Sequence, residues 1–153
     1  MYKKVSAGVY NYSKLARDMN GEWSMVLING RDLTVEEVIR VCRNDEEVKL
    51  TGEAEKNVQK ARDYIEKKLA EKAVIYGLTT GFGKFSNVVI SNEETEKLQR
   101  NLIISHTCSM GEAYPREQVR AAMLLRCNAL ARGNSGIRLS TLKTLIDMLN
   151  RGV

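Results

Sequence analysis

The chain has 153 residues, 43% hydrophobic and 28% charged, which is typical of one globular domain large enough to bury a core. The formal net charge is +5, but 24 basic residues are interleaved with 19 acidic ones and no basic stripe with aromatic residues appears. This pattern argues against nucleic-acid binding. No apolar run reaches signal-peptide or membrane-spanning length, so we expect a cytoplasmic protein without a membrane segment.

Three cysteines and one histidine are too few and too widely spaced to predict a zinc site, so we expect no metal. In a reducing compartment Cys42, Cys108 and Cys127 are expected to be free thiols. Each is expected to pack as a small apolar residue.

The chain begins with residues 1–24, which show little hydrophobic periodicity and predict a loosely ordered arm. Residues 25–153 are the expected folded domain. Its first apolar run, 25–28, is closed by Asn29-Gly30 and predicts a short strand or hairpin. Residues 48–50 are consistent with a second short strand.

Two helices are predicted in the first half of this domain. Thr34 stands three residues before Glu37, as in a capping box, and predicts a helix that ends near residues 44–45. A longer helix opens at Gly52, because apolar residues recur at helical spacing with charges opposite: Ala54, Val58, Ala61, Ile65 and Leu69.

Three more helices are expected in the second half, one of them after an extended run at 88–90. That helix is capped at Ser91 or Asn92, and the only histidine, His106, falls on its apolar side and is expected to face inward. A lone inward histidine is more often a core residue than a site.

The next helix starts at Pro115, stops at Gly133, and is expected to be buried on more than one side because Leu124 and Leu125 widen its apolar face. The last is capped by Ser140 and ends at 150–152. The whole predicts a mainly α fold with a few short β-strands near the N-terminus.

A glycine-rich segment, residues 74–85, interrupts the charged sequence around it. Gly77, Gly81 and Gly83 predict a tight loop with accessible backbone N–H groups, beside the phenol of Tyr76. The spacing of a phosphate-binding P-loop is absent. The plain alternative is a surface turn with a packed tyrosine.

Three segments, 75–83, 98–106 and 123–138, closely resemble the N-terminal part of the aromatic amino-acid ammonia-lyases, and within that family the enzymes that act on histidine. The resemblance extends over about residues 25–153. It implies the N-terminal part of a fumarase/aspartase-like helical fold and a full-length homotetramer. Enzymes of this family eliminate ammonia from histidine, phenylalanine or tyrosine, and histidine yields urocanate.

The resemblance also implies roles for single residues. Tyr76 would act as acid–base, and the backbone of Gly83 would lie against the substrate. Ser105 and His106 would select the substrate ring, because this Ser-His pair resembles the histidine lyases, whereas tyrosine and phenylalanine lyases place His-Leu and Phe-Leu there. A tyrosine, whose ordinary pKa is about 10, needs nearby N–H donors or positive charge to act as a base at neutral pH.

The sequence departs from the family at three places. The electrophile of these enzymes is a methylidene-imidazolone group formed from an internal Ala-Ser-Gly, which does not occur in the 153 residues. We therefore expect an N-terminal fragment that is inactive alone. Thr79 replaces a frequent asparagine, and Ser-Met-Gly at 109–111 replaces Gly-Val-Gly, so a phenylalanine or tyrosine lyase, or an aminomutase, stays open. The alternative of another class is a non-catalytic helical binding module.

Overall fold

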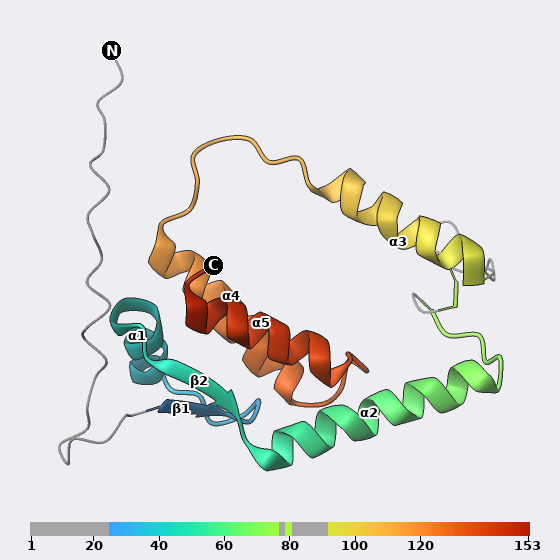
Figure 1. The fold of residues 1–153 in the computed structure, drawn as a ribbon, viewed down its shortest axis with the longest axis horizontal. Helices are drawn as coiled ribbons and strands as arrows, with labels where there is room; N and C mark the ends of the chain where they lie inside the picture. Colours follow the sequence, from blue (N-terminus) through green and yellow to red (C-terminus); the bar gives the residue numbers. More distant parts are fainter. Residues whose placement is uncertain (1–24, 77–78, 81–91) are drawn as a thin grey trace.

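The computed structural model describes residues 25–76, 79–80 and 92–153. Its elements in chain order are β1 (Met25–Ile28), α1 (Val35–Asn44), β2 (Glu47–Leu50), α2 (Gly52–Ala70), α3 (Asn92–His106), α4 (Arg116–Ala131) and α5 (Leu139–Arg151) (Figure 1). The prediction of a mainly α fold with a few short strands near the N-terminus is confirmed. The expected arm at 1–24, the extended run at 88–90 and Ser91, one of the two expected caps of α3, lie outside the described residues.

The two strands form a parallel pair rather than a hairpin. Met25 pairs with Glu47 and Ile28 with Leu50, and α1 makes the crossover between the strands. The hairpin alternative for Asn29-Gly30 is therefore wrong. Gly30 has a φ of 86° and its N–H donates to Oδ1 of Asn128 at 2.8 Å, so this turn binds α4 instead of returning an antiparallel strand.

The predicted helix starts of the first half are observed. Thr34 Oγ1 accepts from the Glu37 N–H at 3.3 Å, and a Glu37 carboxylate oxygen accepts from the Thr34 N–H at 2.9 Å, which completes the capping box. Thr51 caps α2 by accepting from the Ala54 N–H at 3.2 Å. These caps satisfy N–H groups that a helix start leaves without partners.

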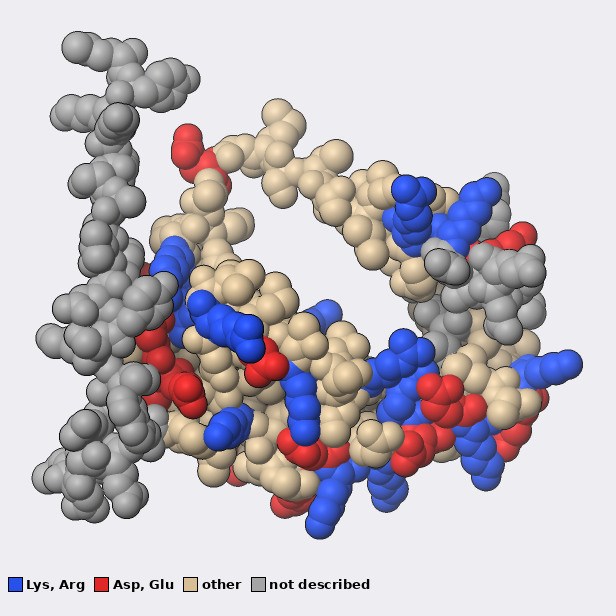
Figure 2. Space-filling model, in the orientation of Figure 1, with Lys and Arg blue, Asp and Glu red and all other residues tan. Residues whose placement is uncertain are grey.

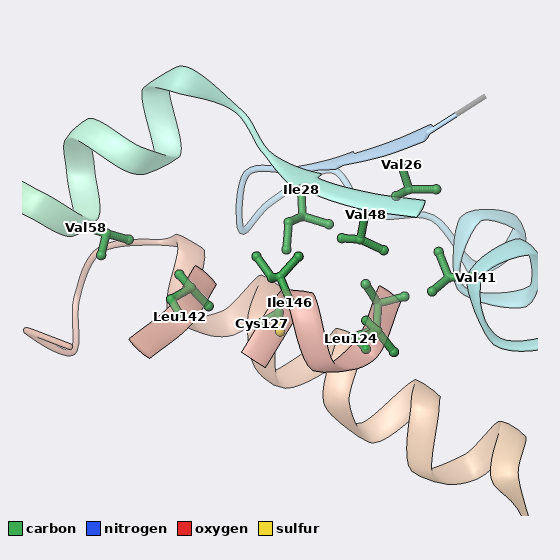
Figure 3. Close-up of a cluster of buried hydrophobic side chains, with 10 residues drawn as sticks. Val26, Ile28, Val41, Val48, Val58, Leu124, Cys127, Leu142 and Ile146 are labelled. Atoms are coloured by element: carbon green, nitrogen blue, oxygen red, sulfur yellow. The ribbon is translucent and has the colours of Figure 1, made fainter. Parts of the chain in front are cut away.

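The core lies where the strand pair, α1 and the first turns of α2 meet α4 and α5 (Figure 3). Alternate residues of β1 face it, while Leu27 between them is exposed. Asn150 of α5 extends the sheet, because its side chain accepts from the Val48 N–H and donates to the Val48 carbonyl, both at 3.0 Å. The buried cluster comprises Val26, Ile28, Val41, Val48, Val58, Leu124, Cys127, Leu142, Ile146 and Leu149.

Two expectations for the last helices are corrected. Leu124 is buried but Leu125 is 53% exposed, so α4 buries one face among the described residues rather than several. Ser140 does not cap α5, because the helix begins at Leu139 with Arg138 in the cap position and no side-chain cap hydrogen bond.

The surface of α2 differs in charge from the segment that joins α3 to α4. Lys and Arg alternate with Asp and Glu along α2, whereas the segment between α3 and α4 contains a single charged residue, Glu112, before the helix begins (Figure 2). Within the described residues, no helix combines the length and apolarity that crossing a membrane requires.

Candidate functional site

Tyr76 stands at the start of a turn that a threonine closes. Thr79 Oγ1 accepts from the Ile75 N–H at 2.8 Å and donates to the Ala73 carbonyl at 3.1 Å, while the Thr79 N–H donates to the Ile75 carbonyl at 2.9 Å. Thr80, the residue after Thr79, is buried. These bonds hold the backbone on both sides of Tyr76, whose residue surface is 65% exposed.

The Ser105–His106 pair closes the C-terminal end of α3. Ser105 Oγ donates to the Leu102 carbonyl at 2.9 Å, and His106 Nδ1 lies 2.9 Å from the same oxygen and 3.0 Å from Ser105 Oγ. A carbonyl oxygen only accepts, so Nδ1 must bear the proton that joins it to Leu102. The imidazole is thereby fixed at one nitrogen by the last turn of its own helix.

This orientation decides what His106 can offer a ligand. With the proton on Nδ1, a neutral imidazole has its acceptor lone pair on Nε2. His106 is exposed in the structure, and no described residue hydrogen-bonds Nε2. The ring can therefore accept a hydrogen bond from an N–H group of a ligand.

The expectation that His106 faces inward is wrong for the described part of the chain. Leu98 and Leu102 are half-buried, but His106 is exposed together with Ile103 and Ile104, which are 63% and 54% exposed. Helical spacing identifies a shared face, whereas burial requires a second element packed against that face. In Figure 1 α3 lies apart from α4 and α5, joined to them by the segment 107–115.

The structure does not unite the predicted site residues at one point. Tyr76 follows α2 at the side where α3 begins, and Ser105 and His106 lie at the other end of α3 (Figure 1). Gly83 lies outside the described residues. Among the described residues, no group of three or more His, Cys, Asp or Glu side chains could hold a metal ion.

Two contributions to this site were missed from the sequence. In the sequence Thr79 is recognisable only as a departure from the family pattern, yet its hydroxyl stabilises the turn at Tyr76. The Leu102 carbonyl orients His106, and the i to i+4 spacing of the two residues was the signal available for it.

The fold and these two segments define a mainly helical domain with an exposed phenol on a braced turn and an exposed, oriented imidazole at a helix end. Residues 33–153 match the family model described as aromatic amino acid lyase. The chain belongs to the aromatic amino acid lyase family.

The similar proteins include enzymes of several names. Histidine ammonia-lyase from Caldanaerobacter subterraneus subsp. tengcongensis is 52% identical over 84% of the chain. Ergothionase from Treponema denticola, solved with desmethyl-ergothioneine sulfonic acid, superposes with a TM-score of 0.78 at 34% identity, covering 84% of this chain and 26% of that one. Phenylalanine aminomutase from Pantoea agglomerans superposes with a TM-score of 0.77 at 34% identity. The match covers 84% of this chain and 25% of that one. The chain spans about a quarter of the length of the curated relatives it matches, 25% in the first case.

Proposed function

We propose that this chain is the N-terminal segment of a histidine ammonia-lyase, which eliminates ammonia from L-histidine to give trans-urocanate. The observation that carries the proposal is the Ser105–His106 pair, in which Nδ1 is bound to the Leu102 carbonyl and Nε2 has no hydrogen-bond partner among the described residues. The 52% identity to a curated histidine ammonia-lyase supports the same substrate.

Ring selection follows from hydrogen bonding in this proposal. The imidazole of L-histidine can donate an N–H to Nε2 of His106, whereas the phenyl ring of phenylalanine has no donor. A site built to hydrogen-bond a substrate group rejects analogues that lack it, because its own polar group is then left unpaired. Ser105 helps to hold the selecting ring through its 3.0 Å contact with Nδ1.

Tyr76 is the proposed acid–base, moving a proton at the β-carbon or the amine of the substrate. The closed turn at Thr79 supports this role, because it holds the residue in place before substrate arrives. We propose that the backbone at Gly83 lies against the substrate.

The electrophile of this family is not supplied by the present residues. The methylidene-imidazolone group forms from Ala-Ser-Gly, and this tripeptide does not occur among the 153 residues. These residues therefore cannot form the group themselves. The proposed activity therefore belongs to the whole enzyme, which we propose to be a cytoplasmic homotetramer acting on a small amino acid. We expect the 153-residue chain alone to form no urocanate.

The proposal is tested by ultraviolet assay of a full-length enzyme containing this segment, with L-histidine, L-phenylalanine and L-tyrosine as substrates. We expect urocanate as the main product. His106→Leu should lower kcat/KM for histidine by roughly 10² to 10⁴, since one substrate hydrogen bond is lost. The matched control is Ile104→Leu, an exposed neighbour on the same turn, which should change kcat/KM by less than about twofold.

Two results would contradict the proposal. A wild-type enzyme that prefers phenylalanine or tyrosine would refute the role of Ser105 and His106 and favour the other lyases or an aminomutase, the activity named for one solved relative. Full activity in Tyr76→Phe would refute the acid–base assignment. A full-length protein inert toward all three substrates would favour the binding-module alternative.

A further inference from the structure

An open groove of about 550 Å³ runs between α2 and the turn that joins α4 to α5. Three segments distant in sequence form it. The turn after β1 contributes Arg31, α2 contributes Lys60 and Tyr64, and the α4–α5 turn contributes residues 132–136. None of the residues proposed for catalysis lines it.

The walls of this groove are held in place by close backbone packing. A Cβ added to Gly133, whose φ is 74°, would lie 2.6 Å from the Asn57 carbonyl oxygen, and one added to Gly136 would lie 2.5 Å from Cγ1 of Ile65. The α4–α5 turn therefore rests directly on α2. Arg62 Nη1 also donates to the Gly136 carbonyl at 3.3 Å.

All the charged side chains that line this groove are basic. Arg31, Lys60 and Arg132 line it, and its lining contains no Asp or Glu, although the chain has 19 acidic residues. Within the part of the chain that the structure describes, none of these three cations forms an ion pair. Carboxylates do occur in a neighbouring cavity of about 130 Å³, which shares Arg31 and Arg132 and is also lined by Asp32 and Glu53.

The remaining lining offers an apolar and a hydrogen-bonding surface. The Tyr64 residue is 60% exposed, and Ile65 lies beside it in the groove. Ser135 contributes a hydroxyl and Asn57 an amide. Guanidinium groups bind phosphoryl oxygens in a bidentate way, and three unpaired cations around one space attract a multiply charged anion.

We propose that this groove is a binding site for a small organic phosphate, with phosphoryl groups held by Arg31, Lys60 and Arg132 and the ring or apolar part of the ligand against Tyr64 and Ile65. The site is independent of the lyase reaction, since it uses neither Tyr76 nor Ser105 and His106. Its ligand is an effector or a second small molecule rather than the amino-acid substrate.

The test is isothermal titration calorimetry of the 153-residue chain with ADP, pyrophosphate and adenosine as probes. We expect saturable binding of ADP with a Kd below about 1 mM, weaker at higher ionic strength because the contacts are exposed. Replacing all three cations, as Arg31→Gln, Lys60→Gln and Arg132→Gln, should raise this Kd by at least about tenfold. The matched control removes three charges from exposed residues outside the groove, as Lys49→Gln, Lys97→Gln and Arg151→Gln, and should change it by less than about threefold.

A second variant leaves the cations in place and changes only the charge of the wall. Ser135→Glu adds a carboxylate to the groove and should weaken ADP binding as much as the triple variant, while Thr141→Glu, exposed and outside the groove, should not. The proposal is overturned if wild-type protein binds neither ADP nor pyrophosphate. It is also overturned if the groove and control triples weaken binding equally, or if adenosine binds as tightly as ADP. Circular dichroism of each variant establishes that a lost signal reflects binding and not unfolding.

Discussion

The three cysteines differ in burial, and their thiols are therefore expected to differ in reactivity. Cys42 and Cys127 are buried, and burial raises the pKa of both thiols, that of Cys127 to about 11. Cys108, in the segment after α3, is exposed. The sequence-based expectation that each cysteine packs as a small apolar residue is thus confirmed for two and wrong for Cys108, because no described element covers it.

Thiol labelling should follow this division. A thiol reagent such as dithionitrobenzoate, applied to the native chain at neutral pH, should modify Cys108 at once, and Cys42 and Cys127 only after unfolding. Peptide mass spectrometry of a time course measures the three rates. Native labelling of Cys127 as fast as Cys108 would contradict the structure.

The raised pKa of Cys127 also predicts how stability depends on pH. In the unfolded chain the thiol loses its proton near pH 9, whereas in the folded chain it keeps the proton to about pH 11. The unfolded state therefore binds fewer protons in this window, and the free energy of unfolding should fall as pH rises, by about 2–3 kcal/mol in total. Urea unfolding at several pH values measures this fall, and Cys127→Ala, which removes the titrating group, should show a shallower one.

At the scale of elements, a single arginine ties three helices together. Arg120 of α4 is buried and donates to the Val41 carbonyl of α1 at 2.9 Å and to the Leu149 carbonyl of α5 at 2.6 Å. Both acceptors lie near helix C-termini, where the dipole is negative. The Leu149 carbonyl also accepts from the Gly152 N–H at 3.2 Å. Burial lowers the pKa of Arg120. Asp45, which lies 3.2 Å from the guanidinium, partly offsets this effect because its negative charge raises that pKa.

Removing this arginine should be costly. Arg120→Ala removes the side-chain donors of the Val41 carbonyl and one of the two donors of the Leu149 carbonyl, so we expect a loss of about 2–4 kcal/mol in the free energy of unfolding. The control Arg126→Ala changes an exposed arginine of the same helix and should cost less than about 0.5 kcal/mol. Equal losses for the two variants in urea unfolding would refute the linking role.

The α4–α5 turn offers a second test at this scale. Gly133→Ala should destabilise the fold by roughly 2 kcal/mol or more, because a Cβ there would clash with the Asn57 backbone and φ is 74°. Gly52, the first residue of α2, has nothing within 4 Å of an added Cβ. Gly52→Ala is therefore the matched control and should be neutral or slightly stabilising, as thermal unfolding would show.

At the scale of the whole molecule, apolar surface remains open on and beyond α3. Ile103, Ile104, Met110 and Tyr114 are exposed, in a chain that spans about a quarter of its curated relatives. Apolar surface of this kind favours association in water. His106 is exposed at the same end of α3.

We expect the 153-residue chain to self-associate through α3. Ile103→Lys with Ile104→Lys should shift it toward monomer in sedimentation velocity, since two lysines cannot be buried without partners. Val119→Lys with Leu125→Lys, two exposed apolar positions of α4, is the control and tests whether association is specific to α3. A monomeric wild-type chain at high concentration would contradict the prediction.

Local signals in the sequence were sufficient for most elements. The Thr34–Glu37 capping box, the stripe beginning at Ala54 and the stop at residues 150–152 predicted helices that the structure contains, because capping and helical periodicity act between residues close in sequence. The family was likewise identifiable from three contiguous motifs, and residues 33–153 match its model.

The tertiary structure decided what depends on contacts between distant segments. The parallel pairing of β1 with β2, the burial of Arg120 and the exposure of Leu125 and His106 each depend on which element packs on which face. Amphipathic spacing assigns a residue to the apolar or the polar face of a helix. It therefore predicted that His106 faces the core, and it would predict that an arginine such as Arg120 faces solvent. Only the three-dimensional arrangement brings two helix C-termini to Arg120 and leaves α3 uncovered by the other described helices, because burial is a property of the neighbours and not of the residue.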